Sequence, residues 1–201
     1  MRILILAGVI CIGVTTAPAA ITGSAHDFSA RGWNSSHEIC IVCHTPHHAD
    51  TSVADSPLWN HEVTTALYTI YSSPTMQATT GQPDGVSKLC LSCHDGTVAL
   101  DSFGGTSGTV HIGGRYDLGT DLSGDHPISF TYDTSLATSD GELADPATAL
   151  SGLGGTIQND LLYGGRLECS SCHDVHNAYN HNNLLVIENA ASALCLTCHT
   201  K

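Results

Sequence analysis

The chain has 201 residues, of which 19 are acidic and only 6 are basic, so its formal net charge at neutral pH is −13. This acidity excludes nucleic acid as a partner and favours basic redox proteins, metal ions or oxide surfaces, because like charges repel. An acidic surface that serves only solubility is the alternative. Thirteen histidines and nine cysteines carry most of the remaining information.

Residues 1–20 have the features of a secretory signal peptide: one basic residue (Arg2), an apolar run over 3–14, and small residues at the end. This pattern predicts export and cleavage, with the loss of Cys11. The apolar run is too short to span a bilayer. We therefore expect a secreted chain over 21–201 without a membrane span.

The next segments predict mostly irregular structure with short helices. Residues 21–37 show no helical apolar period, so we expect an extended N-terminal arm. Ser35 or Ser36 can cap a short helix that continues through CIVCH at 40–44. The segment 57–71 carries apolar residues at helical spacing and predicts another helix.

The long stretch 101–165 is rich in Gly, Ser and Thr and is interpreted as an insertion between the second and third C-x-x-C-H motifs, with almost no apolar core of its own. It contains four short β-like runs between turn signals, which predict two or three hairpin pieces. These runs are 109–113, 116–119, 128–132 and 155–158. Residues 184–197 form the strongest predicted helix, which leads into the last cysteine motif.

The pattern C-x-x-C-H occurs four times, and every cysteine except Cys11 belongs to one of its copies. Each copy can attach one haem through two thioethers while its histidine binds the iron. A zinc ribbon or a disulfide framework would not require a histidine after every pair. We therefore expect four covalently bound haem c groups, attached at Cys40 and Cys43, Cys90 and Cys93, Cys169 and Cys172, and Cys195 and Cys198, with His44, His94, His173 and His199 as proximal iron ligands.

Four porphyrins would supply much of the apolar interior of so small a chain. The expected fold is therefore a single, mostly irregular domain over 21–201, organised by haem, with a few short α-helices at the C-x-x-C-H motifs and short β-hairpins in 101–165. Haem attachment and folding should be one event.

Nine further histidines are available for the opposite faces of the irons. Only Met76 could provide a thioether ligand after cleavage, so we expect His/His coordination at low potential. Sequence context favours five distal candidates, of which four would be used: His26, His47, His61, His126 and His176. The remaining four, His37, His48, His111 and His181, are expected to be exposed.

Two of the distal candidates follow a proximal histidine by three residues. His47 follows His44, and His176 follows His173. A histidine so close to the first cannot reach the far side of the same iron, but it can reach an adjacent haem. Two closely packed haems are the expected consequence.

Seven sequence phrases, in order, resemble exported multihaem c-type cytochromes with doubled C-x-x-C-H motifs, and specifically the filament-forming tetrahaem extracellular cytochromes of the OmcE type. They are SAHDFS at 24–29, CIVCHTPH at 40–47, PLWNHE at 57–62, KLCLSCHDGTVALD at 88–101, DHPISF at 125–130, CSSCHDVHN at 169–177 and CLTCH at 195–199. The resemblance implies a head-to-tail homopolymer at the cell surface, in which bis-His haems form a continuous row. It also implies that one haem in each subunit takes an axial histidine from its neighbour; His26, His47 or another residue is the candidate.

Three functions follow as hypotheses. The leading one is a subunit of an electron-conducting filament, or nanowire, that delivers electrons to redox proteins, metal oxides or electrodes. The second is a soluble monomeric carrier in the periplasm. An enzyme is not expected, because haem catalysis needs an open axial position and spare histidines are abundant here.

Overall fold

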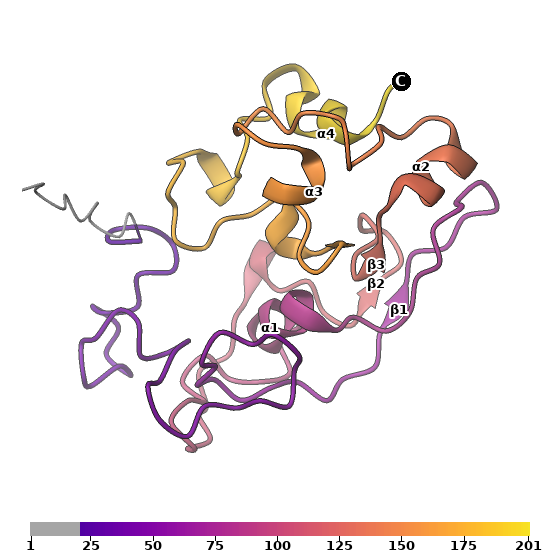
Figure 1. The fold of residues 1–201 in the computed structure, drawn as a ribbon. Helices are drawn as coiled ribbons and strands as arrows, with labels where there is room; N and C mark the ends of the chain where they lie inside the picture. The colour runs from indigo at the N-terminus through magenta and orange to yellow at the C-terminus, as the bar shows by residue number, and fades with distance from the viewer. Residues whose placement is uncertain (1–20) are drawn as a thin grey trace, which may run out of the picture.

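The computed structural model describes residues 21–201, so the predicted signal peptide and Cys11 lie outside the described residues. Regular elements are short, and long irregular segments join them (Figure 1). The helices are α1 (Gly85–His94), α2 (Thr134–Asp140), α3 (Ile157–Asp160) and α4 (Ala193–Cys198). Single 3₁₀ turns lie at Gly114–Tyr116, Cys169–Ser171, Asn182–Leu184 and Ala190–Ser192. In the described residues no helix is long and apolar enough to cross a membrane.

The strands are two residues long and form two separate pairs. They are β1 (Thr69–Ile70), β2 (Asp121–Leu122), β3 (Phe130–Thr131) and β4 (Arg166–Leu167). The β1–β2 pair is parallel, with Ile70 opposite Leu122, and the β3–β4 pair is antiparallel, with Phe130 opposite Leu167. Both pairs join segments far apart in the sequence, so neither is the local hairpin expected for 101–165. Only the run 128–132 contains a strand near its predicted place.

Two helices in the stretch expected to form hairpins are explained by their caps. The Asp133 carboxylate accepts a hydrogen bond from the Leu136 N–H at 2.8 Å and begins α2, and Gly141 ends this helix with φ 74°. The Thr156 hydroxyl accepts a hydrogen bond from the Asn159 N–H and begins α3. An N-cap of this kind outweighs a weak β-preference in a short segment.

Three predicted helices are wrong or shorter than expected. Residues 57–71 are extended, because Trp59 forms β-bridges with His44 and Asp50 and thereby fixes an open backbone. The first cysteine motif makes a single turn, closed by the His44 N–H and the Cys40 carbonyl at 2.8 Å.

The last predicted helix is shortened at its beginning. Within 184–197 only α4 is α-helical, because the residues before it, Ala191 and Ser192, have φ values of 51° and 63° and cannot continue a right-handed helix.

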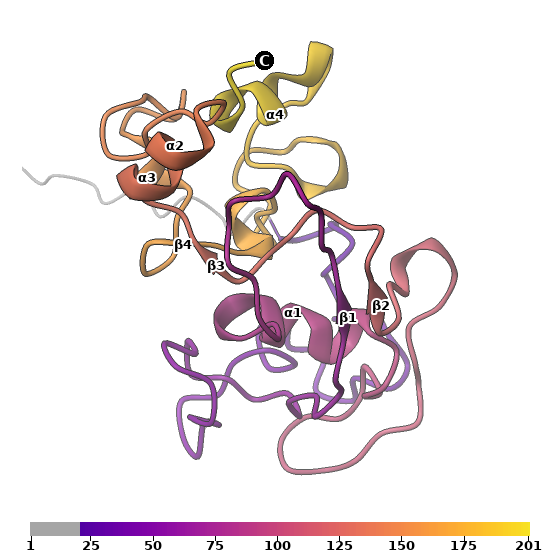
Figure 2. The same cartoon turned by 90° about the vertical axis from the view of Figure 1, so that its right-hand side faces the viewer.

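Two apolar clusters hold the chain together. The larger cluster consists of Phe130, Tyr132, Ala137, Ile157, Leu161, Leu162, Leu167 and Val186. Most of its members belong to 101–165, so this stretch brings a core of its own, contrary to expectation. The smaller cluster consists of Tyr68, Leu91 and Leu122. In both views α2, α3 and α4 lie on one side, while α1, β1 and β2 lie on the other (Figures 1 and 2).

Candidate haem sites

Three of the four cysteine motifs are held by the same pair of backbone hydrogen bonds, which we call the motif clamp. At the first motif, the Asn60 N–H donates to the Cys43 carbonyl at 3.0 Å, and the Thr45 N–H donates to the Leu58 carbonyl at 2.9 Å. The motif is thereby attached to an extended segment on both sides of its histidine, so the backbone at His44 cannot rotate freely.

The third and fourth motifs repeat the motif clamp with other segments. In each, the second cysteine accepts a hydrogen bond and the residue after the histidine donates one. At the third motif, the Val186 N–H donates to the Cys172 carbonyl at 2.9 Å, and the Asp174 N–H donates to the Leu184 carbonyl at 2.7 Å. At the fourth motif, the Ala144 N–H donates to the Cys198 carbonyl at 2.8 Å, and the Thr200 N–H donates to the Glu142 carbonyl at 2.9 Å. The segment that holds the fourth motif comes from within 101–165, so the supposed insertion builds part of this site.

Backbone carbonyl oxygens also orient three of the proximal imidazoles. The acceptors of their Nδ1 atoms are Pro57 for His44 at 2.6 Å, Tyr116 for His94 at 2.8 Å, and Asn183 for His173 at 2.9 Å. When Nδ1 donates to a carbonyl, the proton is fixed there and Nε2 presents its lone pair, as metal-binding histidines usually do. The rings are thus prepared to bind iron.

Three proximal imidazoles each face a second imidazole at nearly equal separation. The ring centroids are 6.0 Å apart for His94 and His26, 6.2 Å for His44 and His176, and 6.2 Å for His199 and His126. A metal–imidazole bond of about 2.0 Å and a nitrogen-to-centroid distance of about 1.1 Å, counted on both sides, give about 6.2 Å for two rings on one metal. The separation of each pair therefore matches that of two imidazoles on one iron.

Burial around the first two motifs also fits haem. Burial lowers the pKa of His26 to about 4, with a smaller contribution from His94, so the ring is neutral near pH 7 and can act as a ligand. Its Nδ1 and the indole Nε1 of Trp59 are buried without a hydrogen-bond partner in the structure. Trp59 lies opposite His44 in a β-bridge, where a haem propionate could accept from its N–H.

The opposite side of His173 differs from the other three sites. In the described part of the chain, no ring contact joins His173 to another histidine, although the motif clamp and the bond from its Nδ1 are both present. The proximal half of this site is formed, and the nearest evidence of a second imidazole among the described residues is an electrostatic interaction between His173 and His26, without a ring contact.

The five distal candidates thus separate into two groups. His26, His126 and His176 lie opposite proximal histidines, while His47 and His61 do not. His61 is buried, and both of its ring nitrogens lie within 3.0 Å of backbone carbonyl oxygens, those of Glu62 and Ala99. His47 is exposed on the surface.

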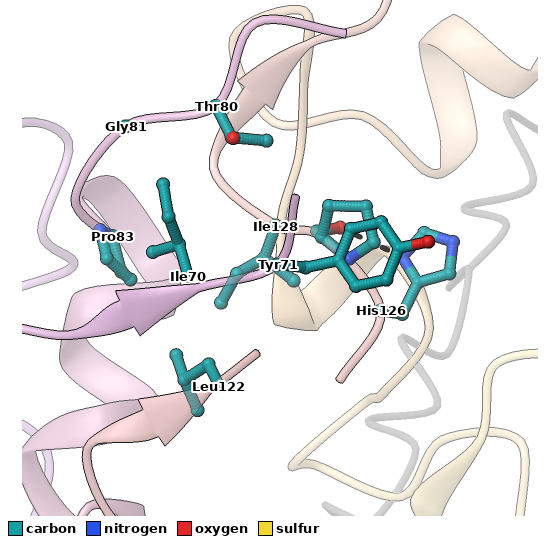
Figure 3. A pocket seen from close by; sticks show the side chains of 9 residues that line it. Ile70, Tyr71, Thr80, Gly81, Pro83, Leu122, His126 and Ile128 are labelled. Atoms are coloured by element: carbon teal, nitrogen blue, oxygen red, sulfur yellow. Dashed lines mark hydrogen bonds between the residues drawn. The ribbon is translucent and has the colours of Figure 1, made fainter. Parts of the chain in front are cut away.

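The backbone of the next residue orients His126. The Nδ1 of His126 lies 2.8 Å from the carbonyl oxygen of Pro127. Figure 3 shows His126 and Tyr71 beside the small hollow that they help to line. Its volume is about 10 Å³, enough for about one water molecule, so it cannot hold a substrate.

A much larger open hollow, of about 650 Å³, lies at the surface beside the first motif. Its lining includes His47, His48, Trp59 and His61, but none of the haem-attaching cysteines. This volume is within the range of about 300–1,000 Å³ that is typical of cofactor pockets. The hollow is therefore large enough to accept a bulky group from outside the chain.

Burial affects two of the cysteines strongly. Burial raises the pKa of Cys43 to about 11 and that of Cys93 to about 12. These thiols therefore stay protonated near pH 7 and are directed into the protein, where thioether bonds to a haem would also be protected.

Sequence reasoning missed two buried carboxylates beside the motifs, Asp95 and Glu168. Although burial opposes it, hydrogen bonds from Tyr68 and Thr64 lower the pKa of Asp95. Both carboxylates could have been noticed from the sequence, because Asp95 directly follows His94 and Glu168 directly precedes Cys169.

Residues 164–201, which include the third and fourth motifs, match the family described as the doubled CXXCH motif. This match supports a multihaem c-type cytochrome. The motifs indicate covalently bound c-type haem and a role in electron transfer. None of the curated proteins matches the chain. The mostly irregular fold of this chain, with its few short helices and two small sheets, is compatible with the same class.

Proposed function

We propose that the cytochrome carries four bis-His haems and conducts electrons as one subunit of an extracellular filament. The observation that supports this most directly is the trio of imidazole pairs separated by 6.0–6.2 Å. An iron closed on both faces by imidazole can exchange electrons but has no position for a substrate. Each haem would supply a one-electron couple, and the protein would set spacing and ligation.

The unpaired His173 supports assembly. Its haem needs a sixth ligand, and a histidine from a neighbouring copy can provide it. Such a contact joins two different surfaces, and a head-to-tail contact that does not close into a ring produces a helical filament. A ligand that crosses the interface would make the filament strongly favoured over the monomer.

His47 is the residue that we propose crosses the interface. It is exposed, and it lines the hollow of about 650 Å³ in which no haem-attaching cysteine takes part. It also follows His44 by three residues, as His176 follows His173, and the ring of His176 faces His44 of another motif. His47 would act in the same way on the haem of a neighbouring copy.

The expected location follows from residues 1–20, whose pattern predicts export through the periplasm to the cell surface. The negative surface would favour basic redox proteins and metal oxides, or an electrode, as electron acceptors. No enzymatic activity is proposed, because three of the four sites have an imidazole on each side.

Filament assembly is tested by purifying wild-type protein, His47→Ala and the control His181→Ala from a host that attaches haem. Electron microscopy should show filaments for wild type and for His181→Ala, whose ring interacts with Glu188 at the surface. His47→Ala should retain four haems by mass but remain monomeric. Filaments formed by His47→Ala would exclude this ligand, and a monomeric wild-type protein would favour the soluble periplasmic carrier.

A further inference from the structure

Glu168 is a nearly fully buried carboxylate, with 2 % of its surface exposed, next to a haem-attaching cysteine. The hydroxyls of Ser87 and Ser129 both donate to its Oε2 atom, the second at 2.8 Å. The Arg166 Nε donates to its Oε1 atom at 3.1 Å. Burying a carboxylate is costly unless such bonds compensate for lost water, and here three of them hold the group in one place.

Glu168 and its two hydroxyl partners belong to three different segments of the candidate haem sites. Ser87 lies in α1, which carries the second motif, and Ser129 follows the distal ligand candidate His126 by three residues. Glu168 itself precedes the third motif, and the N–H of Cys169 donates to the Ser87 hydroxyl at 3.0 Å. One carboxylate therefore connects the second and third motifs and the loop that completes the fourth site.

The second and third attachment sites meet directly beside this carboxylate. A hydrogen bond with the Cys169 thiol, and then burial, raise the pKa of Cys90, and the negative charge of Glu168 acts in the same direction. The charge of Glu168 therefore acts on the Cys90 sulfur, which would bind the second haem. Haems attached through Cys90 and Cys169 would share this edge.

Arg166 does not cancel the charge at this position. Its side chain is 37 % exposed, whereas that of Glu168 is 2 % exposed, so water screens the guanidinium more than the carboxylate. The carboxylate is therefore less screened by water than the guanidinium at the two attachment sites. A negative field stabilises ferric over ferrous iron and lowers the reduction potential.

We propose that Glu168 is a positioning residue for electron transfer between the second and third haems: it holds the two attachment motifs together, and its buried charge lowers the reduction potential of both haems. The inference rests on the proposed function only in requiring haem at these two motifs. It does not require a filament.

The test compares Glu168→Gln with wild type as purified holoproteins. Glutamine keeps the size of the side chain and removes the charge. Potentiometric titration should show two of the haem potentials shifted upward and the others unchanged. The exciton signal of adjacent haems in Soret circular dichroism should remain for Glu168→Gln and weaken for Glu168→Ala, because alanine also removes the connection.

Glu188→Gln is the matched control, because it removes the same charge from a side chain that is 54 % exposed. It should leave all potentials unchanged. Unchanged potentials for Glu168→Gln, or an equal shift for Glu188→Gln, would overturn the electrostatic role. An unchanged exciton signal for Glu168→Ala would overturn the positioning role.

If Glu168→Ala does not mature, the Soret signal is measured on Ser87→Ala, where a weakened signal supports the positioning role and an unchanged one overturns it. Electron microscopy of the same samples tests assembly separately, so the two proposals can fail independently.

Discussion

The third and fourth motifs share one local structure but differ in what lies opposite their histidines. Both are held by the motif clamp. His199 faces His126 at 6.2 Å, whereas no ring contact joins His173 to another imidazole in the described residues. The motif and its clamp therefore prepare only the proximal half of a site. A remote segment decides whether one copy completes the other half.

The difference follows from where the apolar core lies. Cys198 packs against the larger apolar cluster, and the Tyr132 hydroxyl donates to the Ala144 carbonyl at 2.6 Å, in the segment that clamps the fourth motif. Beyond His173 the chain is exposed, with 38 % of Val175 and 43 % of Tyr179 accessible. The apolar core therefore supports the fourth site through Cys198 and its clamping segment, although Cys195 and His199 are themselves exposed, as His173 is.

The largest expected effect comes from His126→Met, which should change only the fourth site. A thioether favours ferrous iron, so one potential should rise on the order of 0.2 V, within the roughly 0.8 V that axial ligands span. Potentiometry and near-infrared magnetic circular dichroism measure the shift and the new ligand. The control His181→Met should change neither, and four unaltered potentials in His126→Met would show that His126 is not a ligand.

The next largest effect is expected for the binding of carbon monoxide, which should distinguish the third site from the fourth. In monomers of His47→Ala, the reduced protein should bind about one equivalent, at the haem held by His173, because only that iron lacks a second imidazole. Soret spectroscopy measures the stoichiometry. Intact wild-type filaments should bind almost none, and equal binding by monomers and filaments would contradict a ligand from a neighbouring copy.

Ile157→Ala should weaken the fourth site through its core. Ile157 is fully buried, and loss of such a side chain costs about 2–5 kcal/mol. Thermal unfolding followed by circular dichroism should show this loss, with the absorbance of the His199 haem changing first. Leu150→Ala, at a side chain that is 76 % exposed, should change stability by less than about 0.5 kcal/mol. Similar losses in both variants would contradict this position of the core.

The smallest effect is expected for Asp133→Ala, which removes the N-cap of α2. The cost should be about 1 kcal/mol, because one N–H at the helix start loses its acceptor. Denaturant unfolding measures it, and Asp133→Asn should restore most of the stability. Since α2 leads into the segment that clamps Cys198, the His199 haem should respond, and a response at the His173 haem instead would argue against this connection.

The sequence was sufficient for the parts of the sites that are local. A thioether pair and its proximal histidine lie within five residues, so C-x-x-C-H specifies them without reference to the rest of the chain. Sequence context also favoured His26, His126 and His176 as distal candidates, and the structure places these three opposite proximal histidines. The caps Asp133 and Thr156 were visible in the sequence too, but weak β-patterns obscured them.

Only the tertiary structure decided which histidines meet and which carboxylates are buried. The extended path of 57–71 depends on pairing with His44, and the burial of Glu168 depends on Ser87, 81 residues earlier in the chain. Such contacts are non-local, and short elements have too little propensity of their own to resist them. The attachment motifs are therefore determined by the sequence alone, whereas the pairing of imidazoles depends on packing, because distant segments hold the rings about 6 Å apart.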